Sequence, residues 1–189
     1  MKYLITVATL FCFTSAFAQS HPLKYTGSIE GGMLNGSYQT TGYLLTTHGV
    51  AMKTWKLSMG TGIDFYRIRT VPVFLELRKE IGKGVNRPFL YTAAGGSFVW
   101  TTERQESESM GWEMQKSSFQ NGFYSRAGAG MIFNAAKHNR LAVSLGWSYK
   151  TIGEKFSQTD WIWGIWPQPN EHNIRYRLHR VQFGVHLLF

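Results

Sequence analysis

Apolar and polar positions alternate along much of this chain, and the alternation is clearest over its last nine residues. Val181, Phe183, Val185, Leu187 and Phe189 hold every second position there. A period of two places such a set on one face of a β-strand. The sequence therefore predicts a final amphipathic strand whose last position is aromatic.

The same period recurs upstream and predicts eight strands in all. Most of them approach the ~9–11 residues with which a tilted strand crosses a bilayer. In the first, third, fourth and seventh strands one face is bulky and apolar, and the other is small or charged. The second and fifth strands leave this assignment open. The eight strands span residues 24–33, 43–52, 57–66, 70–79, 88–100, 123–133, 140–151 and 177–189.

The character of the polar face decides which face points inward. A soluble sandwich or a lipocalin-like barrel also alternates, so alternation alone does not separate these classes. Here glycines share the polar face with acids and bases, a set suited to fill and cross-link a narrow lumen. We therefore predict an all-β fold, an eight-stranded antiparallel up-and-down transmembrane β-barrel with its apolar face toward lipid. The predicted lumen charge network is Glu30, Asp64, Glu76, Arg78, Arg126 and Lys150.

The connections alternate between short and long, as they do in transmembrane barrels. With the amino terminus in the periplasm, the periplasmic turns are short and the outer connections 101–122 and 152–173 are the longest in the chain. The outer connection 67–69 is short and breaks this trend. Aromatic residues toward the strand ends fit a belt at the head-group level, although plain packing would place them similarly. They are Trp55, Tyr66, Tyr91, Trp100, Phe123, Phe133, Trp147 and Tyr149.

The first eighteen residues predict export. Lys2 is followed by an apolar run and by small residues that close at Ala18, which is typical of a secretory signal peptide. We expect a signal peptide over 1–18 and a barrel domain over 19–189, which is 171 of the 189 residues. Cys12, the one cysteine, lies in the leader, so the mature chain offers no thiol chemistry.

Charge narrows the range of partners. The formal net charge is +9, but the bases are scattered, so we expect no nucleic-acid partner. Basic residues near strand ends are suited to anionic lipid head groups or to lipopolysaccharide phosphates. Ordinary solvated surface charge explains them equally well.

The leader, the eight amphipathic strands, the two long outer loops and the ending 181–189 together resemble the small outer-membrane barrels of the OmpX and OmpA transmembrane-domain type. They are also similar to the "outer membrane protein beta-barrel domain" proteins. The resemblance implies a location in the cell outer membrane. It also implies that the outer-membrane assembly machinery reads the last strand as a signal. The positions that match this assembly signal are Phe183, Val185, Leu187 and Phe189.

Two hypotheses about the lumen charges stay open. A salt-bridged plug is favoured because the interior of an eight-stranded barrel is about filled by its own side chains. The other hypothesis is a selective ion or proton path. The six histidines show no ligand spacing, and no arrangement typical of nucleophilic catalysis stands out. We therefore predict no metal, no cofactor and no catalytic residue.

The outer connection 152–173 is dense in aromatic residues, among them Trp161, Trp163 and Trp166. Exposed rings often mark a contact surface. The alternative is that they fold back onto the barrel rim in the head-group layer. We expect a structural, adhesion or surface-interaction role through the long outer loops, with lipid and lipopolysaccharide around the barrel and an extracellular protein or glycan as partner. An outer-leaflet lipid A-modifying enzyme and a small-solute channel are the alternative hypotheses.

Overall fold

The structure is a computed structural model that describes residues 23–37, 39–66, 68–84, 86–100, 117–134, 140–159 and 169–189. Its strands are β1 (Lys24–Asn35), β2 (Thr40–Met52), β3 (Trp55–Phe65), β4 (Arg69–Glu80), β5 (Arg87–Val99), β6 (Ser117–Gln120), β7 (Gly122–Asn134), β8 (Arg140–Thr159) and β9 (Pro169–Leu188). Among these residues there is no helix long and apolar enough to span a membrane.

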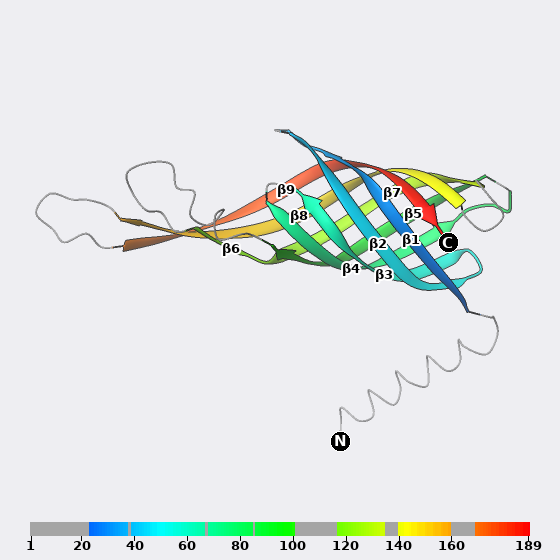
Figure 1. Ribbon diagram of the computed structural model, residues 1–189, viewed down its shortest axis with the longest axis horizontal. Coiled ribbons are helices and arrows are strands. Elements are labelled where there is room, and N and C mark those ends of the chain that lie inside the picture. Colours follow the sequence, from blue (N-terminus) through cyan, green and yellow to red (C-terminus); the bar gives the residue numbers. More distant parts are fainter. Residues whose placement is uncertain are drawn as a thin grey trace, which may run out of the picture.

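Every strand pairs antiparallel with its neighbours, and β9 returns to β1 (Figure 1). β6 and β7 follow one another along β8 and count as one strand of the wall. The sheet is therefore a closed eight-stranded antiparallel barrel, which confirms the predicted fold. The strand bounds agree with the predicted ones to within a few residues, except at β8 and β9. We call the end of the barrel that carries Lys24 and Phe189 the near end, and the end from which β8 and β9 project the far end (Figure 1).

The seam between β1 and β9 closes the barrel. Their register runs from Ser28 opposite Leu188 to Asn35 opposite Val181. Beyond it, Gly27 and Phe189 exchange both backbone hydrogen bonds, at 2.8 and 3.0 Å. The Phe189 ring lies over Gly27, where a Cβ would come within 2.4 Å of a ring carbon. A glycine at this position therefore lets the last aromatic side chain pack flat against the barrel wall.

The apolar face of the strands points outward. Leu75 of β4 is 56% exposed and Leu145 of β8 is 61% exposed, whereas Phe74 beside Leu75 is 2% exposed. The structure also shows which side chains point inward in the second and fifth strands, which the sequence left open. In β2 Tyr43 points inward and Leu44 outward, and in β5 Tyr91 points inward. The barrel is thus apolar outside and holds its charged side chains inside.

Large rings also fill the interior, and this corrects part of the predicted aromatic belt. Tyr66 and Tyr91 are 0% and 3% exposed, so both lie inside the barrel and neither belongs to a belt on its surface. Glycines on neighbouring strands make room for such rings. A Cβ on Gly146 would lie 2.4 Å from the Tyr91 hydroxyl, and one on Gly60 would lie 2.4 Å from the Phe74 ring. The small residues of the polar face therefore serve packing as much as polarity.

At the far end, the prediction of a loop over 152–173 is wrong, because most of this range belongs to β8 and β9. β8 and β9 pair without interruption from Arg140 opposite Leu188 to Thr159 opposite Pro169. Their outer part forms a hairpin that projects beyond the barrel (Figure 1). The predicted loop 101–122 likewise contains β6, which pairs with this hairpin along β8.

A β-bulge joins β6 to β7. Between Gln120 and Tyr124 the chain takes four residue steps, while the opposite stretch of β8, from Gly153 to Lys150, takes three. One extra residue is therefore inserted near Gly122, which reverses the side-chain parity between β6 and β7. A Cβ on Gly122 would meet the Thr151 carbonyl oxygen at 1.8 Å, so the bulge requires glycine here.

Candidate functional site

The centre of the barrel holds a group of carboxylates and guanidinium groups from three strands. Arg126 of β7 donates to Glu30 of β1 at 2.7 Å, and its other terminal nitrogen pairs with Glu76 of β4. All three side chains are almost completely buried. One arginine therefore links two acids that the chain places 46 residues apart, at 30 and 76.

Further partners complete this central group. Arg78 donates to the second oxygen of Glu76 at 2.8 Å and lies over the Phe89 ring at 4.8 Å. The Tyr43 hydroxyl and the Gln182 amide donate to Glu30 at 2.6 and 3.0 Å. Two carboxylates thus face two guanidinium groups, so the group is neutral overall. Buried charges are tolerated when they are paired and hydrogen-bonded in this way.

A second group lies toward the far end. The Lys150 ammonium on β8 contacts both carboxylate oxygens of Asp64 on β3, at 2.6 and 2.5 Å, and also the Thr70 hydroxyl. Thr70 in turn donates to Asp64. Beside this pair, the Tyr66 hydroxyl donates to Ser148.

A third group closes the near end. Lys56 of β3 forms an ion pair with Glu80 of β4 at 2.6 Å. Arg87 and Arg140, each nearly 30% exposed, contact the same carboxylate at 3.2 and 3.7 Å. Basic charge therefore exceeds acidic charge at this rim.

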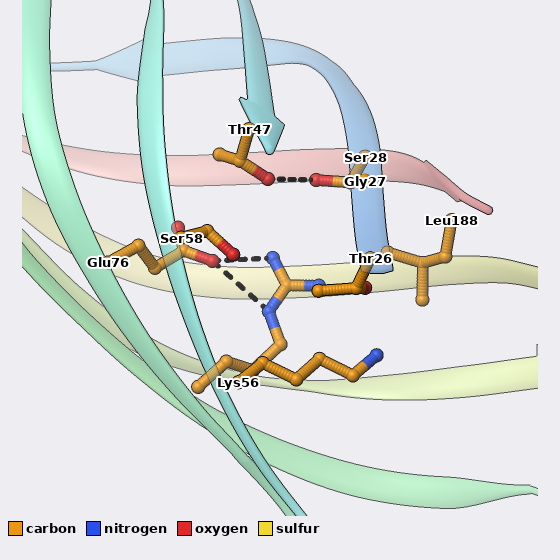
Figure 2. Close-up of a pocket in the computed structure, with 9 residues that line it drawn as sticks. Thr26, Gly27, Ser28, Thr47, Lys56, Ser58, Glu76 and Leu188 are labelled. Atoms are coloured by element: carbon orange, nitrogen blue, oxygen red, sulfur yellow. Dashed lines mark hydrogen bonds and ion pairs between the residues drawn. The ribbon is translucent and has the colours of Figure 1, made fainter. Parts of the chain in front are cut away.

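A small cavity lies inside the barrel toward its near end. A cavity between Ser58, Lys56 and Leu188 holds about 10 Å³ of room for the centre of a water molecule, which is about one water. Figure 2 shows the Ser28 and Thr47 hydroxyls bonded to each other on one side of this cavity and the Lys56 stem crossing another side. The side chains themselves therefore close this part of the lumen.

The structure brings the six predicted lumen residues together in two groups. Glu30, Glu76, Arg78 and Arg126 form the central group, and Asp64 pairs with Lys150. The four positions of the expected assembly signal, Phe183, Val185, Leu187 and Phe189, lie on the outward face at the seam. Trp161, Trp163, Trp166 and the predicted leader fall outside the described residues. Within the described part of the chain, no group of three or more His, Cys, Asp or Glu side chains could hold a metal.

Arg180 is the clearest residue that the sequence reasoning missed. It is 8% exposed at the far end and donates to the carbonyl oxygens of Gln39 and Tyr66, both at 2.6 Å. It thereby ties the β1–β2 connection to the β3–β4 connection. Its parity on β9, shared with Gln182 and His186, was the signal that could have placed it inside. Other partners missed in the same way are Tyr43, Thr70, Gln182, His186 and the pair Lys56–Glu80.

No protein-family model matches this sequence, and no curated protein matches it. Solved structures are similar in fold. The outer membrane protein OprG from Pseudomonas aeruginosa has a TM-score of 0.55 at 9% identity, covering 89% of this chain and 96% of that one. The fold is that of a small outer-membrane β-barrel.

Two further solved structures are similar at lower scores. Neisserial surface protein A has a TM-score of 0.49 at 12% identity, with 87% of this chain and 97% of that chain covered. The β-barrel domain of Pseudomonas aeruginosa OprF has a TM-score of 0.46 at 14% identity, with 89% and 100% covered.

On the outward face of the barrel, one pair of a basic and an aromatic side chain lies near each end of β4. Near the far end the Arg69 guanidinium lies over the Trp100 ring at 4.6 Å, and near the other end the Lys79 ammonium lies over the Trp55 ring at 4.8 Å. Between these two pairs the outward positions of β4 are Val71, Val73, Leu75 and Leu77. The apolar surface on this side is thus bounded at each end by one basic and one aromatic side chain.

Proposed function

We propose that this protein is an integral outer-membrane barrel that serves a structural, adhesion or surface-interaction role at its far end. The near end faces the periplasm and the far end faces the outside. The observation that carries the proposal is the inversion of side-chain character: exposed apolar residues surround an interior of paired charges. This is the pattern of a barrel whose outer solvent is lipid.

The height of the apolar surface supports membrane insertion. From Arg69 to Lys79 β4 takes ten residue steps, which is ~33 Å at ~3.3 Å per residue. A tilt of ~40° reduces this to about 25 Å along the barrel axis, the height of the apolar band of outer-membrane barrels. The Trp100–Arg69 and Trp55–Lys79 pairs then lie at the two head-group layers, where aromatic and basic side chains are favoured.

The interior argues for an anchor rather than a channel. The central group crosses the lumen from β1 and β4 to β7, and the Asp64–Lys150 pair crosses it again from β3 to β8. Opening a path through either group would separate buried, hydrogen-bonded charges, each of which is costly to leave unpaired. The salt-bridged plug is therefore the hypothesis that the contacts favour over an ion path.

The far end supports a role in surface contact. The β8–β9 hairpin stands beyond the barrel, and β6 widens it to three strands (Figure 1). We propose that it carries Trp161, Trp163 and Trp166 outward as a contact surface for a protein or glycan. The signal peptide over 1–18 and recognition of Phe183, Val185, Leu187 and Phe189 by the assembly machinery belong to the same proposal.

The test combines location, folding and conductance. The chain with its leader is expressed in a Gram-negative host, and the outer-membrane fraction is run on gels with and without boiling. We expect a heat-dependent mobility shift in that fraction, and no steady conductance from the purified barrel in planar bilayers. Recovery as a dissolved monomer without detergent would overturn membrane insertion. Stable conductance would overturn the plug.

The surface role has its own test. Replacing Trp161, Trp163 and Trp166 by Ser should lower adhesion of expressing cells to host cells or glycan surfaces. The heat-dependent shift should stay intact, which would show that the barrel still forms. Unchanged adhesion would remove the proposed contact surface.

A further inference from the structure

A groove runs over the outer surface of the barrel where β5, β7 and β8 lie side by side. It has a volume of about 490 Å³, within the ~300–1,000 Å³ range of small-ligand sites. Its floor is low because Thr92, Ala94, Ser125 and Ala127 carry small side chains. In the proposed membrane orientation this groove opens toward the acyl chains of the bilayer.

Three rings form the wall of the groove on its far-end side. Trp147 and Tyr149 come from β8, and His179 comes from β9, directly opposite Tyr149. The His179 ring lies 5.6 Å from the Trp147 ring and 4.9 Å from the Tyr149 ring. Rings of this kind, which are apolar with one polar edge, favour the boundary between acyl chains and head groups.

Basic side chains continue the same face just beyond this wall. Arg177 and Arg175 follow His179 at alternate positions of β9, and Lys155 stands diagonally across from Arg175 on β8. All three are exposed. Because the β8–β9 register is unbroken, these side chains share the outward parity of Tyr149 and His179. Ser118 of β6, opposite Lys155, adds a hydroxyl beside them.

Between the groove and Arg175, no described acid shares this outward face. Four of the six acids in the described part of the chain, Glu30, Asp64, Glu76 and Glu80, point into the barrel. Glu154 has the inward parity of β8, and Glu171 has the outward parity of β9 but lies four residues beyond Arg175, toward Pro169. This outward face therefore runs from the apolar groove, across the aromatic rings, to the basic side chains beyond them.

We propose that this surface, Thr92–Ala127–Trp147–His179–Arg177–Arg175–Lys155, binds one lipid A moiety of lipopolysaccharide. The proposal rests on the membrane orientation given above. Acyl chains lie in the groove, the sugar packs on the rings of Trp147 and Tyr149, and a phosphate is held by Arg175, Arg177 and Lys155. Arginine suits this task because its planar guanidinium binds phosphate with two hydrogen bonds. Charge complementarity selects this occupant, because acyl chains alone would leave the cationic end unused.

The test is a lipid titration of the detergent-purified, folded barrel, followed by native mass spectrometry. The probes are lipid A with both phosphates, the same lipid A with its phosphates removed, and phosphatidylglycerol. We expect one high-affinity lipid A per barrel. Removing the phosphates should raise the apparent Kd at least about tenfold, since a basic residue near a lipid surface contributes ~1 kcal/mol. Equal affinity for phosphatidylglycerol would overturn the assignment to lipid A.

Two variants separate the two ends of the surface. The triple variant Lys155→Gln/Arg175→Gln/Arg177→Gln should weaken binding at least about tenfold. Its control, Lys24→Gln/Lys53→Gln/Lys83→Gln, makes the same change of charge at the near end and should leave binding unchanged. Ala127→Trp should fill the groove and weaken binding, whereas Thr61→Trp on the outward face of β3 should not. Equal weakening in variant and control would show general lipid adhesion and overturn the site.

Each variant is also run on gels with and without boiling. A folded barrel that binds no lipid A defeats this inference alone. A chain that never appears in the outer-membrane fraction defeats the proposed function from which the inference starts.

Discussion

Arg126 is the residue on which the central charges depend, because it contacts both Glu30 and Glu76. Arg126→Met would keep much of the side-chain volume but leave two buried carboxylates with fewer partners. Breaking a buried pair by removing one partner costs about 3–5 kcal/mol. We expect a loss of that order in the free energy of unfolding, measured by urea titration of the barrel in lipid vesicles.

A triple variant is the control for this change. Glu30→Gln/Glu76→Gln/Arg126→Met removes the uncompensated charges together with the cation, so it should recover a large part of the lost stability. If the triple variant were as unstable as Arg126→Met, the contact of the Arg126 guanidinium with the Phe74 and Tyr91 rings would explain the loss, and not the unpaired carboxylates.

Gly60 tests the packing of rings inside the barrel. A Cβ there would lie 2.4 Å from the Phe74 ring and 2.9 Å from Thr47. Since overpacking a filled core costs about 1–3 kcal/mol, Gly60→Ala should lower the unfolding free energy by that amount. The matched control is Gly31→Ala on the outward face, where the nearest atom is 3.7 Å away. Equal losses for the two variants would show that backbone entropy, and not the ring, sets the effect.

For single residues, the sequence predicts which side chains face inward but not which of them contact one another. Alternation places Glu30 and Arg126 on the polar face, yet their contact depends on the register of strands far apart in the chain. The inward positions of Tyr43 and Tyr91 were harder to predict, because an aromatic ring on the inward face contradicts a simple division of each strand into an apolar and a polar face. The glycines opposite such rings, Gly146 among them, are the signal that would have revealed this packing.

The pairing of β1 with β9, which closes the barrel, should be sensitive to a single substitution. Gly27→Ala places a Cβ against the Phe189 ring, which must then leave the barrel wall. We expect amide exchange at the seam, including that of Gly27 and Phe189, to quicken about tenfold for each 1.4 kcal/mol of lost closure. Hydrogen–deuterium exchange measures this, with Gly31→Ala on the same strand as control. Unchanged exchange at the seam would show that the ring does not hold it closed.

The strands of the barrel wall were predicted well and the far end was not. Within the lipid, one face must be apolar, so period two is imposed on every strand. Beyond the bilayer that constraint ends. Asn170, Glu171 and Asn173 therefore look like part of a polar loop, although they belong to β9, which begins at Pro169. The bulge at Gly122 added to the difficulty, because it reverses parity between β6 and β7.

For the molecule as a whole, the orientation of the apolar face is the decisive property. Leu75 lies near the middle of the outward apolar positions of β4. Leu75→Arg would therefore place a charge deep in the acyl chains, which costs about 2–4 kcal/mol at the midplane of a bilayer. We expect that loss in urea unfolding from lipid vesicles. Thr40→Arg, exposed at the far end of β2, should cost ~0–1 kcal/mol. Similar losses at both positions would contradict the proposed membrane band.

The continuous pairing of β8 and β9 also has a mechanical consequence. Twenty residues of each strand form one ladder from the near end to the pair Thr159 and Pro169. Hydrogen bonds between antiparallel strands are perpendicular to the strands. In the proposed orientation, a force that pulls the hairpin away from the cell moves β8 and β9 together and loads the bonds of β9 to β1 and of β8 to β7 in shear, at the same moment rather than one after another. A tether built in this way would transmit tension into the barrel wall without first unravelling.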